Sequence, residues 1–504
     1  MGLSASWNSL QSENDFGLLL AHSPHKPKSG LYGPPALSET PTVRPFFRSM
    51  IGAPERSSCG ETTMAPGQLV ALLFSLLVAF SQLGSAQPIR RQTPPFSGLS
   101  FANVVDYGSG GYYASSAVIA DVNGDGKPDL LIGNQCITAC GGGDPQHGAV
   151  GVLLGKGDGT FRRAESYDSG GYFGYAIAEA DVNGDGNADV IVTLFCGGKP
   201  CYGHSRVGVL TGKGDGTFNP AVTFKSGGYA AESVAVGDLN GDGKLDIVVG
   251  NECVSHHSCK HGLVGVLLGK GHGTFRTVVP YATNGITTSL ALADVNGDGK
   301  LDIVVANYCI KYNCPNHSSV TAGVLLGEGN GKFRRVKTYK AGGYGAASVA
   351  VADVNGDGKP DLIVASQCGS KAVCTDKEST VSVLLGMGNG TFGAPVKFET
   401  GGYSAYSVVV ADVNQDGMPD LVVANGCASS GCTDNGSAAI LLGNGDGTFQ
   451  AAVTYDSGGW RPLSVAVGDL NGDGWPDIVL ANDWVDESNL SGVVGVLINS
   501  SGTR

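Results

Sequence analysis

The hydrophobic residues of this chain fall in short segments separated by turns rich in Gly, Asn and Asp, from about residue 98 to residue 499. In one such stretch, Ser348–Ala352 alternates between the two faces with a period of two, which is typical of a strand. Asp361–Ala365 and Val381–Leu385 are short apolar runs, and Val396–Glu399 follows a glycine-rich turn. This stretch therefore predicts four short strands and no helix.

The same order of segments occurs seven times at nearly regular intervals. Between the first and second predicted strands, each unit carries the motif Asp-x-Asn-x-Asp-Gly-x-x-Asp, which begins at Asp121, Asp181, Asp238, Asp294, Asp353, Asp412 and Asp469. Repeated units of four strands are typical of propellers. We expect an all-β fold, a seven-bladed β-propeller of four-stranded antiparallel blades. Ala or Gly before each motif leaves room where the innermost strands converge.

The two ends of the repeat region complement each other. The last unit stops after its third strand, Val494–Ile498, whereas a spare strand-like segment, Phe101–Tyr107, precedes the first motif. We predict that this N-terminal strand completes the seventh blade and closes the ring. Closure would also remove an open sheet edge, which otherwise favours aggregation.

The sequence before the repeats differs in character. Residues 1–63 show no periodicity and are expected to be unstructured or an extension of the gene model, with Met64 as the true start. Residues 64–86 contain an apolar run, Leu69–Phe80, and end in small residues, the order of a signal peptide. An uncleaved internal anchor is the alternative, although the run is short for a bilayer. Residues 87–97 are a proline-containing linker, 98–499 the repeat domain and 500–504 a tail.

These features predict a secreted, extracellular or cell-surface protein that is a monomer and has no transmembrane segment in its mature chain. The net charge of −13 argues against nucleic acid as a partner. Three Asp residues in each of seven motifs account for 21 of the 45 acidic residues. The acidity is therefore concentrated in the motifs rather than spread over the surface.

The motif has the composition of a site for a hard cation. Calcium is bound by six to eight oxygens, and each motif offers side-chain oxygens at positions 1, 3, 5 and 9, with a turn glycine at position 6. The alternative is a hairpin turn without an ion. Three neighbouring carboxylates would repel one another unless a cation neutralised them. We therefore expect calcium, up to seven ions in all, which would take the formal charge from −13 to about +1.

Residues 98–499 resemble the FG-GAP or VCBS repeats of integrin α-subunit propellers and of many secreted bacterial proteins. The resemblance rests on Asp121–Asp129 and on Gly155–Phe161, the phrase Gly-Lys-Gly-Asp-Gly-Thr-Phe, and both are closest to the bacterial type. It implies a seven-bladed propeller, calcium in the loop between the first and second strands, and an extracellular setting. In integrins only some blades hold calcium, whereas all seven motifs are intact here.

Carried over by position, the resemblance implies four side-chain ligands and one backbone carbonyl, at position 7, in each loop. The side-chain ligands would be Asp121, Asn123, Asp125, Asp129, Asp181, Asn183, Asp185, Asp189, Asp238, Asn240, Asp242, Asp246, Asp294, Asn296, Asp298, Asp302, Asp353, Asn355, Asp357, Asp361, Asp412, Asn414, Asp416, Asp420, Asp469, Asn471, Asp473 and Asp477. The carbonyls would be those of Lys127, Asn187, Lys244, Lys300, Lys359, Met418 and Trp475. Gln415 replaces Gly at a position that is not a ligand, so this change is expected to cost little.

Twelve of the 13 cysteines fall in pairs, and each pair lies between the second and third predicted strands of one unit. Free thiols or zinc ligands are the alternative, but an isolated pair does not supply four donors. In a secreted chain, even pairing favours local disulfides. The predicted pairs are Cys136 with Cys140, Cys196 with Cys201, Cys253 with Cys259, Cys309 with Cys314, Cys368 with Cys374, and Cys427 with Cys432.

The calcium motifs and the Gly-rich turns should share one face of the ring, and the disulfide loops the other. On this second face six units place an aromatic residue after a Gly-Gly pair: Tyr112, Tyr172, Tyr229, Tyr344, Tyr403 and Trp460, here called the aromatic crown. Such rings suit a sugar or peptide ligand, but their recurrence is equally typical of packing. The histidines near these loops are expected to be solvated side chains rather than transition-metal ligands.

No nucleophile elbow, phosphate-binding loop, zinc-protease motif or Ser/His/Asp arrangement stands out, and we do not expect an enzyme. We expect a calcium-binding, non-catalytic binding or adhesion module that recognises a protein or carbohydrate ligand through its disulfide-loop face, since variable loops on a rigid scaffold commonly carry recognition. The alternatives are a lectin-like, carbohydrate-binding propeller and, less favoured, an enzyme that uses the propeller as its scaffold.

Overall fold

The computed structural model describes residues 99–139, 147–196, 203–255, 259, 261–308, 320–369, 378–486 and 489–502. Within these residues there are 28 strands and no helix, which confirms the all-β prediction. The described part thus contains no helix that could cross a membrane. The predicted N-terminal extension, signal peptide and linker lie outside the described residues.

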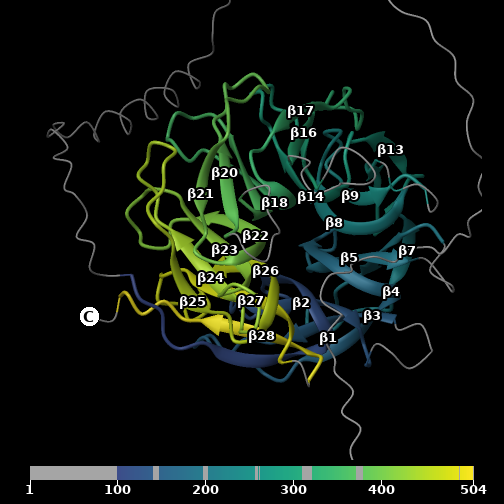
Figure 1. Ribbon diagram of the computed structural model, residues 1–504. Coiled ribbons are helices and arrows are strands. Elements are labelled where there is room, and N and C mark those ends of the chain that lie inside the picture. The colour runs from purple at the N-terminus through teal and green to yellow at the C-terminus, as the bar shows by residue number, and fades with distance from the viewer. Residues whose placement is uncertain are drawn as a thin grey trace, which may run out of the picture. The chain divides into compact units, whose positions relative to one another are not determined.

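The third to sixth units each form a sheet of four antiparallel strands, and the fifth unit illustrates their order (Figure 1). Its strands are β18 (Tyr344–Ala352), β19 (Asp361–Cys368), β20 (Thr380–Leu384) and β21 (Val396–Glu399). Each strand pairs with the next along the chain. In Figure 1 the first strands β14, β18, β22 and β26 lie nearer the middle, and the fourth strands β13, β17, β21 and β25 lie toward the outside.

The third, fourth and sixth units form similar four-stranded sheets. Their strands are β8 (Tyr229–Gly237), β9 (Asp246–Cys253), β10 (Leu263–Leu267) and β13 (Val279–Ala282); β14 (Thr287–Ala293), β15 (Asp302–Asn307), β16 (Thr321–Leu325) and β17 (Lys337–Lys340); and β22 (Tyr403–Ala411), β23 (Asp420–Cys427), β24 (Ser437–Leu441) and β25 (Val453–Asp456). A small hairpin, β11 (Gly269–Gly271) with β12 (Thr274–Phe275), occupies the glycine-rich turn of the third unit.

The seventh, first and second units differ from the prediction of separate blades, because they form one ten-stranded sheet. Two strands, β1 (Val105–Ala120) and β4 (Glu165–Ala180), stay extended through the Gly-Gly segment and so belong to two units each. The other strands of this sheet are β2 (Asp129–Cys136), β3 (His147–Leu153), β5 (Asp189–Cys196), β6 (Arg206–Leu210), β7 (Val222–Lys225), β26 (Trp460–Gly468), β27 (Asp477–Trp484) and β28 (Ser491–Leu497).

The N-terminal segment packs against the C-terminal unit. Val105–Gly108 of β1 pair antiparallel with Val493–Val496 of β28. Phe101 forms a bridge with Asn499, as Phe392 in the turn of the fifth unit does with Gly386. The Phe101 ring also lies 5.1 Å from that of Tyr455, edge to face. Phe101 therefore takes the place of the turn phenylalanine that the last unit lacks.

The apolar core consists of clusters that each lie between two consecutive units. The second strands explain this arrangement, because the first six residues of β19 are buried on both faces of the sheet. One cluster joins Val364 and Leu384 of the fifth unit to Val304 and Val324 of the fourth. Another joins Leu130 of the first unit to Val479 of the seventh. An apolar cluster therefore lies between consecutive units, including the first and last units.

Polar contacts also connect neighbouring units through their first strands. These strands contact one another in the order β1, β4, β8, β14, β18, β22, β26 and again β1. A serine on one strand accepts a hydrogen bond from a backbone N–H of the next, for example Ala117 N–H to Ser464 Oγ at 3.2 Å and Ile177 N–H to Ser116 Oγ at 3.3 Å. In the second unit Ala176 stands at the equivalent position and has no hydroxyl.

Candidate functional site

The candidate calcium loops have closely similar backbone geometry. In the fifth loop, Asp353 Oδ1 accepts the N–H of Gly356 at 2.8 Å, and Asp353 Oδ2 accepts the N–H of Gly358 at 2.7 Å. Both glycines have positive φ angles, 71° and 79°, which an L-residue adopts only with strain. Gln415 takes the position of Gly356 in the sixth loop with a φ of 56°, and its Nε2 donates to Gly474 O at 2.5 Å.

The aspartate at position 9 connects each loop to the sheet. Asp361 is fully buried, and its Oδ2 accepts the N–H of Val354 at 3.0 Å while its Oδ1 accepts that of Gly386 at 2.6 Å. The equivalent carboxylates make the same two bonds in the other six loops, with Asn499 in place of the glycine in the seventh. This residue therefore joins the loop to the end of the third strand.

Burial raises the pKa of these buried aspartates. The pKa reaches about 6 for Asp189, Asp302, Asp420 and Asp477, and the backbone hydrogen bonds oppose the shift only in part. The carboxylates at positions 1 and 5 of the same loop raise it further. Three carboxylates in each loop thus lie close enough to repel one another, and a cation among them would relieve this repulsion.

The donor chemistry of the loops fits a hard divalent cation, since it is made of carboxylate and amide oxygens. In five loops the asparagine at position 3 donates its amide N–H to a carboxylate, as Asn471 does to Asp473 at 3.0 Å. These amides would have to rotate to present their oxygens to a cation. The residues at position 7 donate their backbone N–H groups to the position-5 aspartate.

The predicted disulfides are present wherever both cysteines are described. Cys253 is bonded to Cys259, and Cys427 to Cys432. Cys136, Cys196 and Cys368 are also disulfide-bonded, and their predicted partners lie outside the described residues. The predicted pair Cys309 and Cys314 lies wholly outside them.

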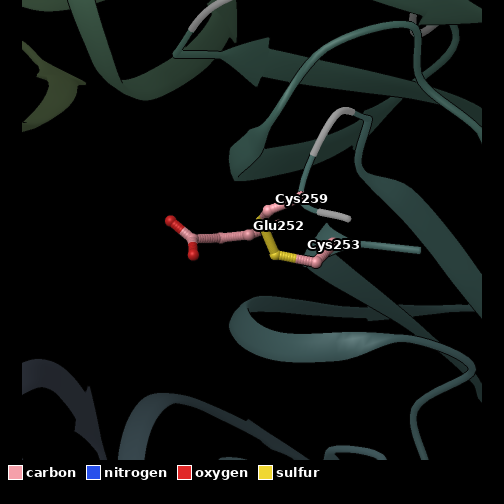
Figure 2. A group of neighbouring side chains, drawn as sticks. All are labelled: Glu252, Cys253 and Cys259. Atoms are coloured by element: carbon pink, nitrogen blue, oxygen red, sulfur yellow. A yellow bond between two sulfur atoms is a disulfide. The ribbon is translucent and has the colours of Figure 1, made fainter. Parts of the chain in front are cut away.

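Figure 2 shows Glu252 next to the disulfide of the third unit, with its carboxyl group directed away from the sulfur atoms. Ligand-type atoms of Glu252, Cys253 and Cys259 lie within 4.8 Å of one another. Both sulfurs are used in the disulfide, so neither is a thiolate that could bind a metal. Glu252 is therefore available for other contacts.

The aromatic crown lies beside the disulfide loops. Tyr112 is the cross-strand partner of Cys136, and Tyr229 that of Cys253. The same pairing holds for Tyr172, Tyr344 and Tyr403, and Trp460 faces Trp484 in the unit without cysteines. All six side chains are partly buried. Their place beside the cysteines supports the packing interpretation of the crown.

Two of the predicted solvated histidines pack on crown residues. The ring of His147 lies 5.0 Å from that of Tyr172, and its Nδ1 lies 2.7 Å from Asp168 Oδ2. His204 lies 4.5 Å from Tyr229, ring to ring. Each contact pairs one histidine with one tyrosine ring. Neither contact brings two histidines together, as a transition-metal site would require.

The sequence analysis missed a second group of residues, which breaks the repeat symmetry at the same end of the strands. Two positions account for most of it. One is the sixth residue before each motif, on the first strand, and the other is the residue before each first cysteine, or before Trp484 in the seventh unit, at the end of the second strand. They carry Tyr175, Glu232, Glu252, Tyr308, Tyr406 and Asp483, which with Arg461 and Trp484 we call the inner polar cluster. Divergence at positions flanked by near-identical repeats was the signal that could have revealed it.

The part of the cluster in the seventh unit contains an internal ion pair. Arg461 Nη1 lies 3.2 Å from Asp483 Oδ2, and the guanidinium lies 5.0 Å from the Trp484 ring centre and 5.9 Å from that of Tyr406. Arg461 has a positive φ of 50°, as do Tyr113 and Phe173 at the equivalent positions, with φ values of 58° and 53°. Burial raises the pKa of Asp483 to about 7, against the effect of Arg461.

The part of the cluster in the third unit contains two carboxyl groups. Burial raises the pKa of Glu232 well above its usual value, and the neighbouring Glu252, with which it shares a hydrogen bond, raises it further. Burial likewise raises the pKa of Glu252. Two carboxyl groups in such contact hold one proton between them more readily than two isolated groups would.

Comparison with known proteins gives matches along the repeat region. The model of the FG-GAP-like repeat matches residues 137–192, 194–249, 258–305, 316–364, 372–423 and 428–480, and that of the FG-GAP repeat matches residues 113–135. These matches cover more than half of the chain.

The curated relatives are larger proteins. Integrin alpha-V of Gallus gallus is 27% identical over 220 residues, which are 40% of this chain and 21% of the relative. Integrin alpha pat-2 of Caenorhabditis elegans is 30% identical over 242 residues, 42% of this chain and 18% of the relative. Phosphatidylinositol-glycan-specific phospholipase D of Rattus norvegicus is 29% identical over 153 residues, 27% of this chain and 18% of the relative. The chain thus spans about a fifth of the length of these relatives.

Among solved structures, the one titled "Crystal structure of BBS1N in complex with ARL6DN, soaked with mercury" aligns with a TM-score of 0.47 and 9% identity. The alignment covers 80% of this chain and 97% of that chain. A TM-score at this level does not establish a shared fold.

Proposed function

Because the chain belongs to the FG-GAP-like repeat family, we propose that it is a calcium-stabilised, seven-bladed β-propeller that acts outside the cell as a non-catalytic binding or adhesion module. The observation that carries this proposal is the group of three carboxylates, one of them fully buried, in each of the seven loops. Burying an ionised carboxylate lowers the free energy of unfolding unless the charge is paired, and a bound cation would supply that pairing.

Closure of the ring is supported by three kinds of contact between the seventh and first units. Val105–Gly108 pair with β28, Ala117 N–H donates to Ser464 Oγ, and Gly159 N–H donates to Leu470 O at 3.2 Å. Equivalent hydrogen bonds to a serine hydroxyl and from a turn glycine occur between other consecutive units. For example, Gly216 N–H of the second unit donates to Val122 O of the first at 3.1 Å. The first and seventh units thus meet as ordinary neighbours do.

Calcium at these loops would act on stability rather than on chemistry. A site that binds tenfold more tightly than the ambient calcium concentration contributes about 1.4 kcal/mol to the free energy of unfolding. Seven such sites would together contribute roughly 10 kcal/mol, comparable with the whole stability of a typical domain.

The test is thermal unfolding of the mature protein in millimolar calcium and in excess chelator, together with calorimetric titration of the chelated protein. We expect a fall in the melting temperature of many degrees on chelation, and more than one ion bound per chain. An unchanged melting curve and no calcium-binding heat would contradict the proposal. Magnesium at the same concentration is the control, because it prefers a smaller, more rigid site than these loops offer.

An extracellular location is supported by the disulfides, since such bonds persist mainly in oxidising compartments. N-terminal sequencing of the mature secreted protein would test both the location and the proposed cleavage after Ala86. A product that retains residues 64–86 would instead indicate an uncleaved anchor.

Ligand recognition is proposed for the disulfide-loop face, where the repeats diverge most. Capture of a partner by the immobilised protein in calcium, but not in chelator, would support a protein ligand. The second candidate is a carbohydrate ligand, which the combination of aromatic rings and carboxyl groups in the inner polar cluster favours. Binding on a glycan array that is lost when Tyr175 and Tyr406 are replaced by Leu would favour this alternative.

A further inference from the structure

A cavity of about 430 Å³ lies where β1 passes from the seventh unit into the first. One wall is formed by residues 108–112 of β1 and residues 491–492 of β28. The opposite wall is formed by residues 162–164, which precede β4, and by Ser166 within it. The hydroxyl group of Ser166 donates a hydrogen bond to Gly110 O, which joins the two walls. The volume is in the range of small-molecule sites, about 300–1,000 Å³.

The strand pairing shows which residues of the next unit boundary are equivalent to those of the cavity. In the pairing of β1 with β28, Gly108 precedes an irregularity in register, and Tyr112, opposite Ser491, follows it. The pairing of β4 with β3 has the same irregularity, with Asp168 in the place of Gly108 and His147 in the place of Ser491. The two boundaries therefore share a backbone course and differ in side chains.

Larger side chains occupy these two positions at the next boundary. His147 Nδ1 lies 2.7 Å from Asp168 Oδ2, and the His147 ring packs on that of Tyr172. By contrast, a Cβ atom added to Gly108 would meet no heavy atom within 4 Å. The outer strands of the other units also carry a side chain at this position, namely Lys225, Ala282, Lys340, Glu399 and Asp456. The cavity is therefore a gap in the repeat, left by smaller residues at two positions.

The cavity is basic, although the chain has a net charge of −13. Arg162 and Arg163 line it, and no described aspartate or glutamate does. Neither guanidinium group forms an ion pair or a hydrogen bond with another described residue. Both side chains are exposed, so the cavity is accessible from this side. Because guanidinium groups bind carboxylates through paired N–H donors, the two arginines indicate an anionic ligand.

The inner part of the cavity is apolar. Leu153, which is fully buried, and Ile137, which is half-buried, line it. The hydroxyl groups of Ser109 and Ser166 also line it, but both already donate hydrogen bonds within the protein. A ligand with many hydroxyl groups would therefore meet few free partners here, whereas an apolar body would fit.

We propose that this cavity binds a small organic acid with an apolar body. Arg162 and Arg163 hold its carboxylate, and Leu153 and Ile137 contact the apolar part. None of the described lining residues belongs to a calcium loop. The inference goes beyond the proposed function, because it assigns a ligand to the boundary between the seventh and first units and does not depend on calcium.

The experiment is calorimetric titration of the protein in millimolar calcium with phenylacetate, with hexanoate, and with phenylacetamide, the neutral counterpart of phenylacetate. Both acids are expected to bind, and the amide more weakly by roughly tenfold or more, because it has nearly the same shape without the charge. No binding of either acid, or equal binding of phenylacetate and its amide, would overturn the proposal. Inorganic sulfate that binds as tightly as the acids would also contradict it, since the apolar body would then contribute nothing.

Variants locate the site. Arg162→Gln with Arg163→Gln is expected to weaken phenylacetate binding by roughly tenfold or more. Arg334→Gln with Arg335→Gln is the matched control, because this exposed pair has the same position in the fourth unit, and it should leave binding unchanged. Gly108→Leu places a side chain in the open space and should weaken binding several-fold. Equal weakening by the two double variants would mean that the acid binds to basic surface in general, which refutes the assignment.

The outcomes separate this inference from the proposed function. The melting temperature in calcium verifies that each variant is folded, and unchanged affinity in a folded Gly108→Leu variant would contradict the location. Calcium-dependent stability is measured without any acid present. If stability depends on calcium while neither acid binds, the proposed function survives and this inference fails. If the acids bind as expected while chelation leaves stability unchanged, this inference stands and the proposed function fails.

Discussion

At the scale of the residue, the aspartate at position 9 has two roles. Asp361 accepts backbone hydrogen bonds from Val354 and Gly386, which attach the loop to the sheet. The same carboxylate belongs to the proposed calcium site, where its charge is needed. Because both oxygens are used, an amide at this position loses one acceptor as well as the charge.

We predict that Asp361→Asn destabilises the protein by about 1–3 kcal/mol even in chelator, because one buried N–H loses its acceptor. In calcium the loss of unfolding free energy should be larger, by the contribution of the one calcium site that the substitution removes. The free energy of unfolding in denaturant, measured in both conditions, distinguishes the two parts. Glu399→Gln is the control for charge alone, and equal losses in calcium and chelator would show that Asp361 holds no ion.

The raised pKa values predict a pH dependence of the calcium effect. Four position-9 aspartates have folded-state pKa values of about 6, above the usual 3.8 of the unfolded chain. The folded, calcium-free protein therefore binds more protons than the unfolded one, and its stability falls as the pH rises from about 4 through 6. Bound calcium would offset this loss by favouring the ionised form.

The difference in melting temperature between calcium and chelator should thus grow from pH 5 to pH 7. Differential scanning fluorimetry at constant ionic strength measures it. A difference that stays constant across this range would mean that the buried aspartates do not take part in the calcium effect.

At the scale of the element, neighbouring units are joined by serines on the first strands. The backbone N–H of Val349 donates to Ser289 Oγ and that of Leu290 to Ser233 Oγ, at 3.2 and 3.0 Å. The contact between the last and first units, Ala117 with Ser464, is of the same kind. Each serine satisfies a backbone donor that would otherwise be partly buried without a partner.

We predict that Ser464→Ala lowers the free energy of unfolding by about 1 kcal/mol, the usual net value of such a bond. Ser429→Ala, in an exposed loop of the sixth unit, should change it by less than half as much. Chemical denaturation of both variants in calcium provides the comparison. Equal stability of the two would mean that the bond between the seventh and first units contributes nothing.

At the scale of the whole molecule, residues some 400 positions apart complete one unit. Ser100 Oγ and Ser500 Oγ lie 2.8 Å apart, and Ala102 N–H donates to Ile498 O at 2.8 Å. Phe101 supplies the aromatic ring of the missing turn, and Val105–Gly108 supply the fourth strand. Bringing together segments so distant in sequence costs chain entropy, because the entropy of loop closure grows with the length of the loop.

The proposed ring closure predicts a specific cross-link. Val105 and Val496 are directly opposite on β1 and β28, so Val105→Cys with Val496→Cys should form a disulfide under mild oxidation. Val105→Cys with Val494→Cys is the matched control, because Val494 is opposite Tyr107 instead. Peptide mapping by mass spectrometry identifies the bond. Two free thiols in the first variant would contradict the closure.

The sequence by itself determined the repeat, the loops and the local pairs, because these depend on residues close together in the chain. The alternation in Ser348–Ala352, the motif at Asp353 and the pairing of Cys427 with Cys432 are all local signals, and the structure contains the corresponding strand, loop and disulfide.

Only the tertiary structure decided which residues of different units meet. The extended course of β1 and β4 through two units and the substitution of Phe101 for a turn residue depend on packing between distant segments. The inner polar cluster depends on the same packing, because no two of its members from different units are neighbours in the chain. The repeated residues form the scaffold, and the residues that differ between units form a cluster only when the units pack together.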